Sequence, residues 1–360
     1  MKNILYILIF LIILNSTALT AKEKKMKWID CKDHYVGGKL FSDAPHYFRL
    51  NTKDLEMLTK EDIRYQTGNC PSGLHIDFIT DTKNLSVRWT LKDLHIDAYT
   101  NINTQGGLDL YMRNGKEWMF VKNAAPTYKE LTNERVMFTD TNFIKYAGYE
   151  NTFSLNLPIY EEVESIEIGI DEDAVFRDVT DTRDPIIFYG TSITHGACAG
   201  RPGLTYVTQT RYALNENVIN FGFGGGGRLD HKLVDLLCTV NAKILVVEPF
   251  ANMPENIAEE RLTYFYNTYR KIHPATPIVF IEMQPIIDRR IRTDKTDNKN
   301  IILRRLFSKW KKTDRNIYKL NSSETFSEQN TMDTIHPNDV GEAEMAKHIT
   351  SLLKKILNNM

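Results

Sequence analysis

The stretch IIFYGTSITHGACAG, residues 186–200, decides the fold of the second half of the chain. It begins as an apolar run that ends at Gly190, and a small hydroxyl residue, Ser192, follows two positions later. A dense apolar run bounded by glycine is typical of a strand covered on both faces, as in a parallel sheet. Ser192 is then either the N-cap of a helix or a side chain held where open sheets of this kind bind ligands.

The same dense apolar pattern recurs downstream, with helical stretches between the runs. The predicted strands are residues 185–190, 217–223, 242–250, 276–283 and 316–321, and the predicted helices are residues 254–273, 298–313 and 340–357. Alternation of strand and helix predicts a parallel sheet with right-handed crossovers. The second half is therefore predicted to be α/β, a three-layer αβα domain of flavodoxin-like type.

In the first half of the chain, the apolar residues are spaced differently. Its apolar residues alternate with polar ones, and turn clusters such as TDTKN and RNGKE separate the runs. The clearest of these predicted strands are residues 74–79, 85–91, 107–112 and 152–160. Many short strands and no convincing helix predict an antiparallel β-sandwich of jelly-roll-like form.

Chain length agrees with two domains, because single cores rarely grow beyond about 250–300 residues and this chain has 360. Residues 171–184 are polar, as a linker would be. We predict an N-terminal sandwich domain over residues 22–180 and the αβα domain over residues 181–360.

The first 21 residues predict export. Lys2 precedes an aliphatic run from Ile4 to Leu14, and small residues follow, with plausible cleavage after Ala18 or Ala21. This pattern is typical of a signal peptide, and the alternative is an uncleaved membrane anchor. No other stretch is apolar enough to cross a bilayer, so we expect a periplasmic or extracellular protein without membrane contact after cleavage.

Composition narrows the classes of partner and cofactor. The formal net charge is −1 and 25% of residues are charged, so nothing indicates a nucleic-acid-binding protein. Export permits disulfides, but sequence leaves three full pairings of Cys31, Cys70, Cys198 and Cys238 open, with Cys31–Cys70 the easiest to imagine. None has CxxC spacing, so no metal or other cofactor is expected. The oligomeric state stays open.

Reactive or hydrogen-bonding residues follow several predicted strands at one common edge. FGFGGGGR, residues 221–228, ends the second strand with four consecutive glycines. EPFANM, residues 248–253, places Asn252 just beyond the third strand. Near the end of the chain, DTIHPND, residues 333–339, sets Asp333 three positions before His336.

These residue types together suit acyl transfer. A serine hydroxyl needs a neighbouring base to take its proton, and imidazole titrates near neutral pH, so His336 is the candidate base for Ser192. Asp333 is close enough in sequence to hold the far ring nitrogen of His336. The glycine run, Asn252 and the backbone N–H of Ser192 are candidate donors to an oxyanion.

Each element also has an ordinary structural explanation. Ser192 and Asn252 are good helix caps, and the Asp, Pro and Asn of DTIHPND are turn residues. The glycine run suits a loop or a phosphate cradle, although it lacks the lysine and Ser/Thr of a phosphate loop. Their joint placement in register favours one active site over four coincidences.

The four blocks YGTSITHG, FGFGGGG, EPFANM and DTIHP resemble those of the SGNH (GDSL-like) esterase and lipase superfamily over about residues 185–357. The resemblance implies that Ser192 is the nucleophile, that Asp333 and His336 complete a triad, and that Ser192, Gly225 and Asn252 form the oxyanion hole. The first block lacks the Asp and Leu of the name motif, and glycines flank Gly225 where Ser and Asn are common. Glu248 stands where the third block usually has Asp.

The choice of glycine follows from the usual spacing of the second block, in which the donor lies five residues after Asn220. Gly225 satisfies that spacing, and Gly224 and Gly226 stay as alternatives.

The upstream half extends the resemblance. GLDLY, residues 107–111, is similar to the motif of a β-rich domain that precedes a bacterial subgroup of these hydrolases. That subgroup implies an esterase that removes acetyl groups from polysaccharides, with an acylated carbohydrate as partner. The alternatives are a short-chain lipase, thioesterase or acyltransferase using the same residues, and a carbohydrate-binding protein with a vestigial site.

Several further residues are candidates for substrate contact. Arg201 and Arg228 flank the predicted site and are expected either to line the pocket or to lie on the surface. Residues 288–300 form either a rim that contacts a sugar or uronic acid, or a solvated loop. His195 lies too close to Ser192 in sequence to be its base, so it is expected to be a pocket wall or a surface residue.

Overall fold

The computed structural model describes residues 25–51, 53–54, 67–95, 100–115, 117–143, 150–284 and 296–360. The predicted signal peptide and most of the predicted rim at 288–300 lie outside these residues. Within the described ranges, no helix combines the length and the apolar character that a bilayer crossing requires.

The C-terminal domain contains a five-stranded parallel sheet in the order β11-β10-β12-β13-β14. Its strands are β10 (Ile186–Gly190), β11 (Val218–Gly222), β12 (Ile244–Glu248), β13 (Ile278–Ile281) and β14 (Ile317–Leu320). Because β10 lies between β11 and β12, the strand order reverses at β10. Crevices at such reversals, beyond the carboxyl ends of the strands, are the usual ligand sites of open α/β sheets.

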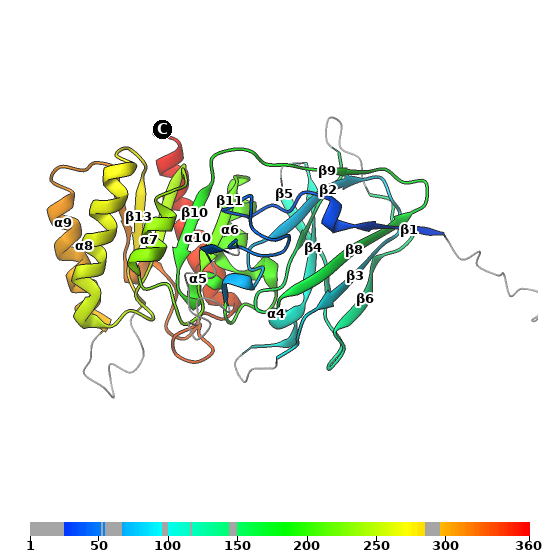
Figure 1. Ribbon diagram of the computed structural model, residues 1–360, viewed down its shortest axis with the longest axis horizontal. Coiled ribbons are helices and arrows are strands. Elements are labelled where there is room, and N and C mark those ends of the chain that lie inside the picture. The colour runs from blue at the N-terminus through cyan, green and yellow to red at the C-terminus, as the bar shows by residue number, and fades with distance from the viewer. Residues whose placement is uncertain are drawn as a thin grey trace, which may run out of the picture.

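Helices cover both faces of this sheet (Figure 1). They are α5 (Ser192–His195), α6 (Tyr206–Leu214), α7 (His231–Leu237), α8 (Glu255–Ile272), α9 (Thr296–Trp310) and α10 (Asp339–Leu357), with short 3-10 turns η2 (Pro202–Leu204) and η4 (Ser322–Glu324). Along β10, Ile187 and Tyr189 pack in one apolar core with residues of α7, α8 and α9, whereas Ile186 and Phe188 pack with α6 and α10. The predicted three-layer αβα architecture is confirmed.

The N-terminal domain is the predicted antiparallel sandwich, at the opposite end of the molecule from α8 and α9 (Figure 1). One sheet has the order β1-β8-β3-β6 and the other β5-β4-β7-β2-β9. The strands are β1 (Met26–Asp30), β2 (His75–Thr80), β3 (Leu85–Leu91), β4 (Leu108–Asn114), β5 (Glu117–Ala124), β6 (Thr132–Phe138), β7 (Thr152–Asn156), β8 (Val163–Asp171) and β9 (Phe176–Asp178), with the 3-10 turn η1 (Cys31–Asp33). Phe78, Trp89 and Phe153 are fully buried in the core of the sandwich.

One sequence-based expectation for this half was wrong, because a short helix, α4 (Ile102–Gly106), interrupts the strands. Strand β2 forms where the sequence predicts it. Although its residue types alternate, it is buried almost throughout, because the C-terminal domain covers the outer face of its sheet. There Asp77 of β2 pairs with Arg211 of α6, and Asn156 of β7 donates to the Tyr212 hydroxyl at 2.9 Å.

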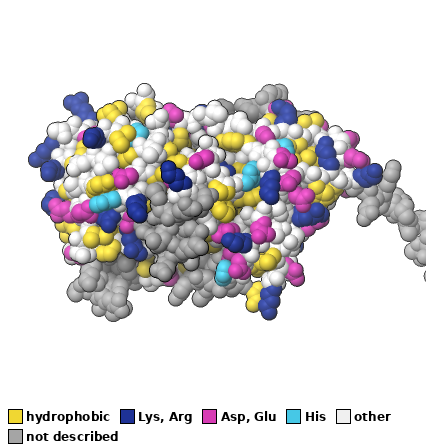
Figure 2. All heavy atoms as spheres, viewed as in Figure 1, with side chains coloured by type: hydrophobic (Ala, Val, Ile, Leu, Met, Phe, Trp, Pro, Cys, Tyr) yellow, Lys and Arg dark blue, Asp and Glu magenta, His cyan; other side chains and the backbone are white. Residues whose placement is uncertain are grey.

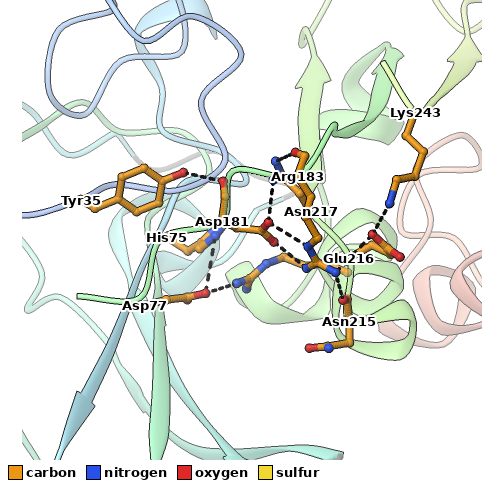
Figure 3. Close-up of polar contacts among 10 residues, drawn as sticks. Tyr35, His75, Asp77, Asp181, Arg183, Asn215, Glu216, Asn217 and Lys243 are labelled. Atoms are coloured by element: carbon orange, nitrogen blue, oxygen red, sulfur yellow. Dashed lines mark hydrogen bonds and ion pairs between the residues drawn. The ribbon is translucent and has the colours of Figure 1, made fainter. Parts of the chain in front are cut away.

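Ionic contacts also hold the segment between the domains (Figure 3). Arg183 donates to both carboxylate oxygens of Asp181, at 2.9 and 2.6 Å, and to the backbone carbonyl of Asn215 at 2.9 Å. Tyr35 of the N-terminal domain donates to the Asp181 carbonyl at 3.2 Å. The connection is therefore tied to both domains.

All four cysteines are buried, and no disulfide joins them. The Cys31–Cys70 pairing that the sequence permitted is not formed. The Cys70 thiol donates instead to the carbonyl of Tyr160, at 2.6 Å.

On the face seen in Figure 2, Lys and Arg side chains are interspersed with Asp and Glu.

Candidate active site

Ser192 lies on the wall of a cavity of about 950 Å³ at the carboxyl end of β10. It is the first residue of α5, so its backbone N–H has no acceptor within that helix. The cap of α5 is Thr191, whose hydroxyl accepts from the backbone N–H of Ile193 at 3.3 Å. The interpretation of Ser192 as an N-cap is therefore wrong, and its hydroxyl is available for another partner.

That partner is His336. The Ser192 hydroxyl lies 2.7 Å from Nε2 of His336, and Nδ1 of the same ring lies 2.6 Å from Asp333 Oδ2. A carboxylate only accepts, so Nδ1 carries the proton and Nε2 accepts from the serine. Partial burial raises the pKa of Asp333, but hydrogen bonds from the His336 backbone and ring outweigh it and hold that pKa below its ordinary value.

The turn that carries Asp333 and His336 is braced by its own backbone. Asp333 Oδ1 accepts from the N–H groups of Ile335 and His336, at 3.1 and 2.8 Å. Thr334 has a φ of 73°, a left-handed conformation that is unusual for a β-branched residue and folds the chain back on itself. The Met332 N–H closes the turn by donating to the His336 carbonyl at 2.9 Å.

The glycine run after β11 approaches the same cavity. Gly224 and Gly225 line it, whereas the N–H of Gly226 donates to the Phe223 carbonyl at 3.0 Å. Of the three glycines that the sequence left open, Gly226 is therefore excluded as an oxyanion donor. A side chain at Gly227 would place its Cβ 2.1 Å from the Gly190 carbonyl oxygen, so the loop can pass this close to β10 only with glycine there.

Asn252 lines the cavity beside the glycines. Its side-chain amide donates to the Gly226 carbonyl at 3.1 Å. An amide group carries two N–H donors, and among the described residues this is the one acceptor found for Asn252, so a second N–H is left for a ligand. The alternative role as a helix cap does not apply, since the cap of α8 is Pro254.

Glu248, at the end of β12, lies beneath the serine turn and is buried. One of its carboxylate oxygens accepts from the Thr191 N–H at 3.1 Å, from the Thr191 hydroxyl at 2.6 Å and from the Thr194 hydroxyl at 3.2 Å. Burial raises the pKa of Glu248, and the threonine donors oppose that effect only in part. Glutamate in place of the usual aspartate thus holds the turn on either side of Ser192.

Neither arginine proposed from sequence lines the cavity. The guanidinium of Arg201 donates to Asp109 at 2.6 Å and to the Tyr111 hydroxyl at 2.7 Å, so it joins the GLDLY segment to the C-terminal domain. Arg228 donates to the carbonyl of Gly225 at 2.9 Å and braces the glycine loop. The expectation of substrate contact is corrected for both, because their guanidinium groups are engaged within the protein.

His195 is fully buried, and with Arg49 it links three segments around the site. Arg49 Nη2 lies 3.3 Å from Nδ1 of His195, and the opposite nitrogen lies 2.8 Å from the Ile159 carbonyl. Burial, with the nearby Arg49 charge, lowers the pKa of His195 to about 3, so the ring is neutral. Arg49 also donates to the Gly222 carbonyl at 2.6 Å, just before the glycine loop. Sequence carried no signal for Arg49, because its partners are backbone carbonyls of distant segments.

Within the described residues, no group of three or more His, Cys, Asp and Glu side chains is arranged to hold a metal ion. The site is instead a line of serine, imidazole and carboxylate facing a group of N–H donors.

Comparison with known protein families agrees with this geometry. Residues 183–354 match the GDSL-like Lipase/Acylhydrolase family, and residues 26–176 match the family described as the N-terminus of Esterase_SGNH_hydro-type. The C-terminal domain is thus a GDSL-like lipase/acylhydrolase domain. The protein is therefore a carboxylic ester hydrolase, with the sandwich domain characteristic of one esterase type.

Solved structures share the arrangement of both domains of this GDSL-like hydrolase. A GDSL-like protein from Bacteroides ovatus is 25% identical, with a TM-score of 0.84, and the match covers 93% of this chain and 98% of that one. The salicylyl-acyltransferase SsfX3 from a tetracycline biosynthetic pathway is 16% identical, with a TM-score of 0.74 and coverage of 92% and 97%. A family two carbohydrate esterase from Cellvibrio japonicus is 14% identical, with a TM-score of 0.58 and coverage of 93% and 99%. The last two show a shared fold alone. No curated protein sequence gives a match.

Proposed function

We propose that this GDSL-like hydrolase is an exported serine esterase that removes O-acetyl groups from carbohydrates. Ser192 is the nucleophile, His336 the general base and Asp333 the residue that orients it. The Ser192 N–H, the N–H of Gly225 and the free amide N–H of Asn252 form the oxyanion hole. The observation that carries the proposal is the unbroken hydrogen-bonded line from Ser192 through His336 to Asp333 on the cavity wall.

The geometry supports a two-step reaction. Ser192 Oγ attacks the ester carbonyl while its proton passes to Nε2 of His336, and Asp333 stabilises the resulting imidazolium. The oxyanion hole binds the negative oxygen, and each such donor is typically worth about 10²–10³ in rate. The intermediate collapses when the C–O bond to the alcohol breaks and His336 returns its proton to that oxygen. Water, deprotonated by the same imidazole, then attacks the carbonyl of the acyl-serine. The C–O bond to Ser192 breaks as His336 returns the proton to Ser192 Oγ, and the acid is released.

Two features support a small acyl group on a polar alcohol. The cavity lining includes the small side chains of Ala197, Cys198 and Ala251 from the C-terminal domain. The residues that the N-terminal domain contributes to the lining are mostly polar. An exported enzyme, as the first 21 residues predict, would meet acetylated polysaccharides outside the cell.

Ser192→Ala tests the proposal directly. We expect the variant to lose 4-nitrophenyl acetate hydrolysis by a factor on the order of 10⁶, and to release no acetate from a panel of acetylated glycans. Ser323→Ala, at an exposed serine outside this cavity, is the matched control. Equal rates for wild type and Ser192→Ala would exclude the serine mechanism. N-terminal sequencing of the protein recovered from the cell exterior tests export, and retention of residues 1–21 on a cytoplasmic protein would contradict it.

A further inference from the structure

Asn69, Lys92 and Glu162 are among the residues of the N-terminal domain that line the cavity containing Ser192. Asn69 lies in a short helical turn, Lys92 follows strand β3, and Glu162 lies between β7 and β8. None of the three belongs to the proposed triad or oxyanion hole. They meet although Asn69 and Glu162 are 93 residues apart in the chain.

Glu162 holds these side chains in place. One of its carboxylate oxygens accepts from the Asn69 amide at 3.0 Å, and the other accepts from the Lys92 ammonium at 2.9 Å. The carboxylate and ammonium charges offset each other. The cluster therefore presents a fixed polar surface without a strong net charge.

Asn69 has one side-chain atom without a hydrogen-bond partner in the part of the chain that the structure describes. The residue is only 6% exposed, and its Oδ1 is buried without a hydrogen-bond partner among the described residues. Flipping the Asn69 side-chain amide would not satisfy this atom. The flip would place Oδ1 against the Glu162 carboxylate, and two acceptors cannot form a hydrogen bond. A buried acceptor left unpaired is costly, so this oxygen requires a donor.

We propose that Asn69, positioned by Glu162 and Lys92, binds a hydroxyl group of the alcohol part of the ester. The inference rests on the proposed function and deepens it. An acetyl group and a simple alkyl alcohol carry no N–H or O–H donor, whereas a partly acetylated sugar carries several hydroxyls. Asn69 thereby makes the N-terminal domain part of the substrate site, and selects esters of polyhydroxylated alcohols.

A matched pair of primary acetates tests this role. Methyl 6-O-acetyl-glucoside carries ring hydroxyls, and cyclohexylmethyl acetate has a ring of the same size without them. We expect wild type to show a higher kcat/KM for the glucoside. The ester without hydroxyls would leave Asn69 Oδ1 buried without a hydrogen-bond donor, which disfavours its binding. In Asn69→Ala the ratio of the two kcat/KM values should fall roughly 2- to 10-fold, as for one neutral hydrogen bond.

The matched control is Asn84→Ala. Asn84 is a buried amide of the same domain, 7% exposed, bonded to Asp171 at 2.7 Å and outside the cavity. We expect this variant to keep the wild-type ratio. A folded Asn69→Ala variant with an unchanged ratio would overturn the inference.

A substrate series on wild type covers the case in which Asn69→Ala does not fold. Removing one hydroxyl at a time from the methyl glucoside should lower kcat/KM strongly at one position. If wild type shows the same kcat/KM for all the deoxy substrates, the inference of a hydroxyl-binding subsite is also overturned. Ser192-dependent hydrolysis with no dependence on hydroxyls refutes only this inference, whereas hydrolysis that survives Ser192→Ala refutes the proposed function itself.

Discussion

The orientation of His336 provides the sharpest test of the catalytic arrangement, through Asp333→Asn. In the structure Asp333 Oδ1 accepts two backbone N–H groups, at 3.1 and 2.8 Å, while Oδ2 faces Nδ1 of His336 at 2.6 Å. An asparagine must keep its oxygen at the first position, because the two N–H groups there need an acceptor. Its NH₂ group is thereby forced towards Nδ1.

This orientation reverses the tautomer of the ring. The asparagine donates to Nδ1, so the proton moves to Nε2, which can no longer accept from Ser192 2.7 Å away. We expect kcat to fall about 10⁴-fold, equivalent to about 5.4 kcal/mol in the activation barrier. Because the turn keeps its hydrogen bonds, Tm should change little.

The assay is hydrolysis of 4-nitrophenyl acetate with Tm measured in parallel. Asp235→Asn, at an exposed carboxylate bonded to Tyr264 at 2.6 Å, is the control and should keep wild-type kcat. A folded Asp333→Asn enzyme with kcat within tenfold of wild type would refute the reasoning, because the ring would then not depend on a carboxylate acceptor.

Further predictions concern stability and metal independence. Arg201→Met should lower the free energy of unfolding in urea by about 3 kcal/mol, because Asp109 is fully buried and loses its cation. The control is Arg305→Met, at an exposed ion pair, which should leave the midpoint of urea unfolding unchanged. An unchanged midpoint for Arg201→Met would contradict the prediction. Burial raises the pKa of Glu342 well above its ordinary value. The folded state therefore binds that proton more tightly than the unfolded state, and stability falls as pH rises above about 4.3 towards the folded-state pKa. Glu342→Gln should flatten this decline of stability with pH. If wild type and the variant show the same dependence of unfolding free energy on pH from pH 5 to 8, Glu342 is not its cause. EDTA should leave hydrolysis unchanged; a loss that zinc restores would contradict a metal-free mechanism.

Sequence was enough to predict the C-terminal domain because its signals are local. Dense apolar runs at 185–190 and 242–250 became β10 and β12, and helical periodicity at 254–273 became α8. The candidate site followed from the same pattern, since parallel strands end at one edge and bring the residues after them together. Ser192 and His336, and His336 and Asp333, lie within hydrogen-bond distance of each other, at 2.7 and 2.6 Å.

The N-terminal half was harder to predict in detail for a physical reason. Strand β2 alternates in sequence, yet it is buried on both faces because the other domain covers its sheet. The glycine run left three candidate donors, and only the bond between the Gly226 N–H and the Phe223 carbonyl removed one of them. Local periodicity reports which face of an element is apolar, but it does not report what packs against the polar face.

Local pattern thus predicted two domains, their architectures and the group of residues around Ser192. Contacts between distant parts of the chain decided the rest: Arg201 pairs with Asp109 across 92 positions instead of facing substrate, and Asn69 meets Glu162 across 93. Such pairs leave no periodic trace in sequence, because each member is an ordinary polar residue until folding places it against its partner.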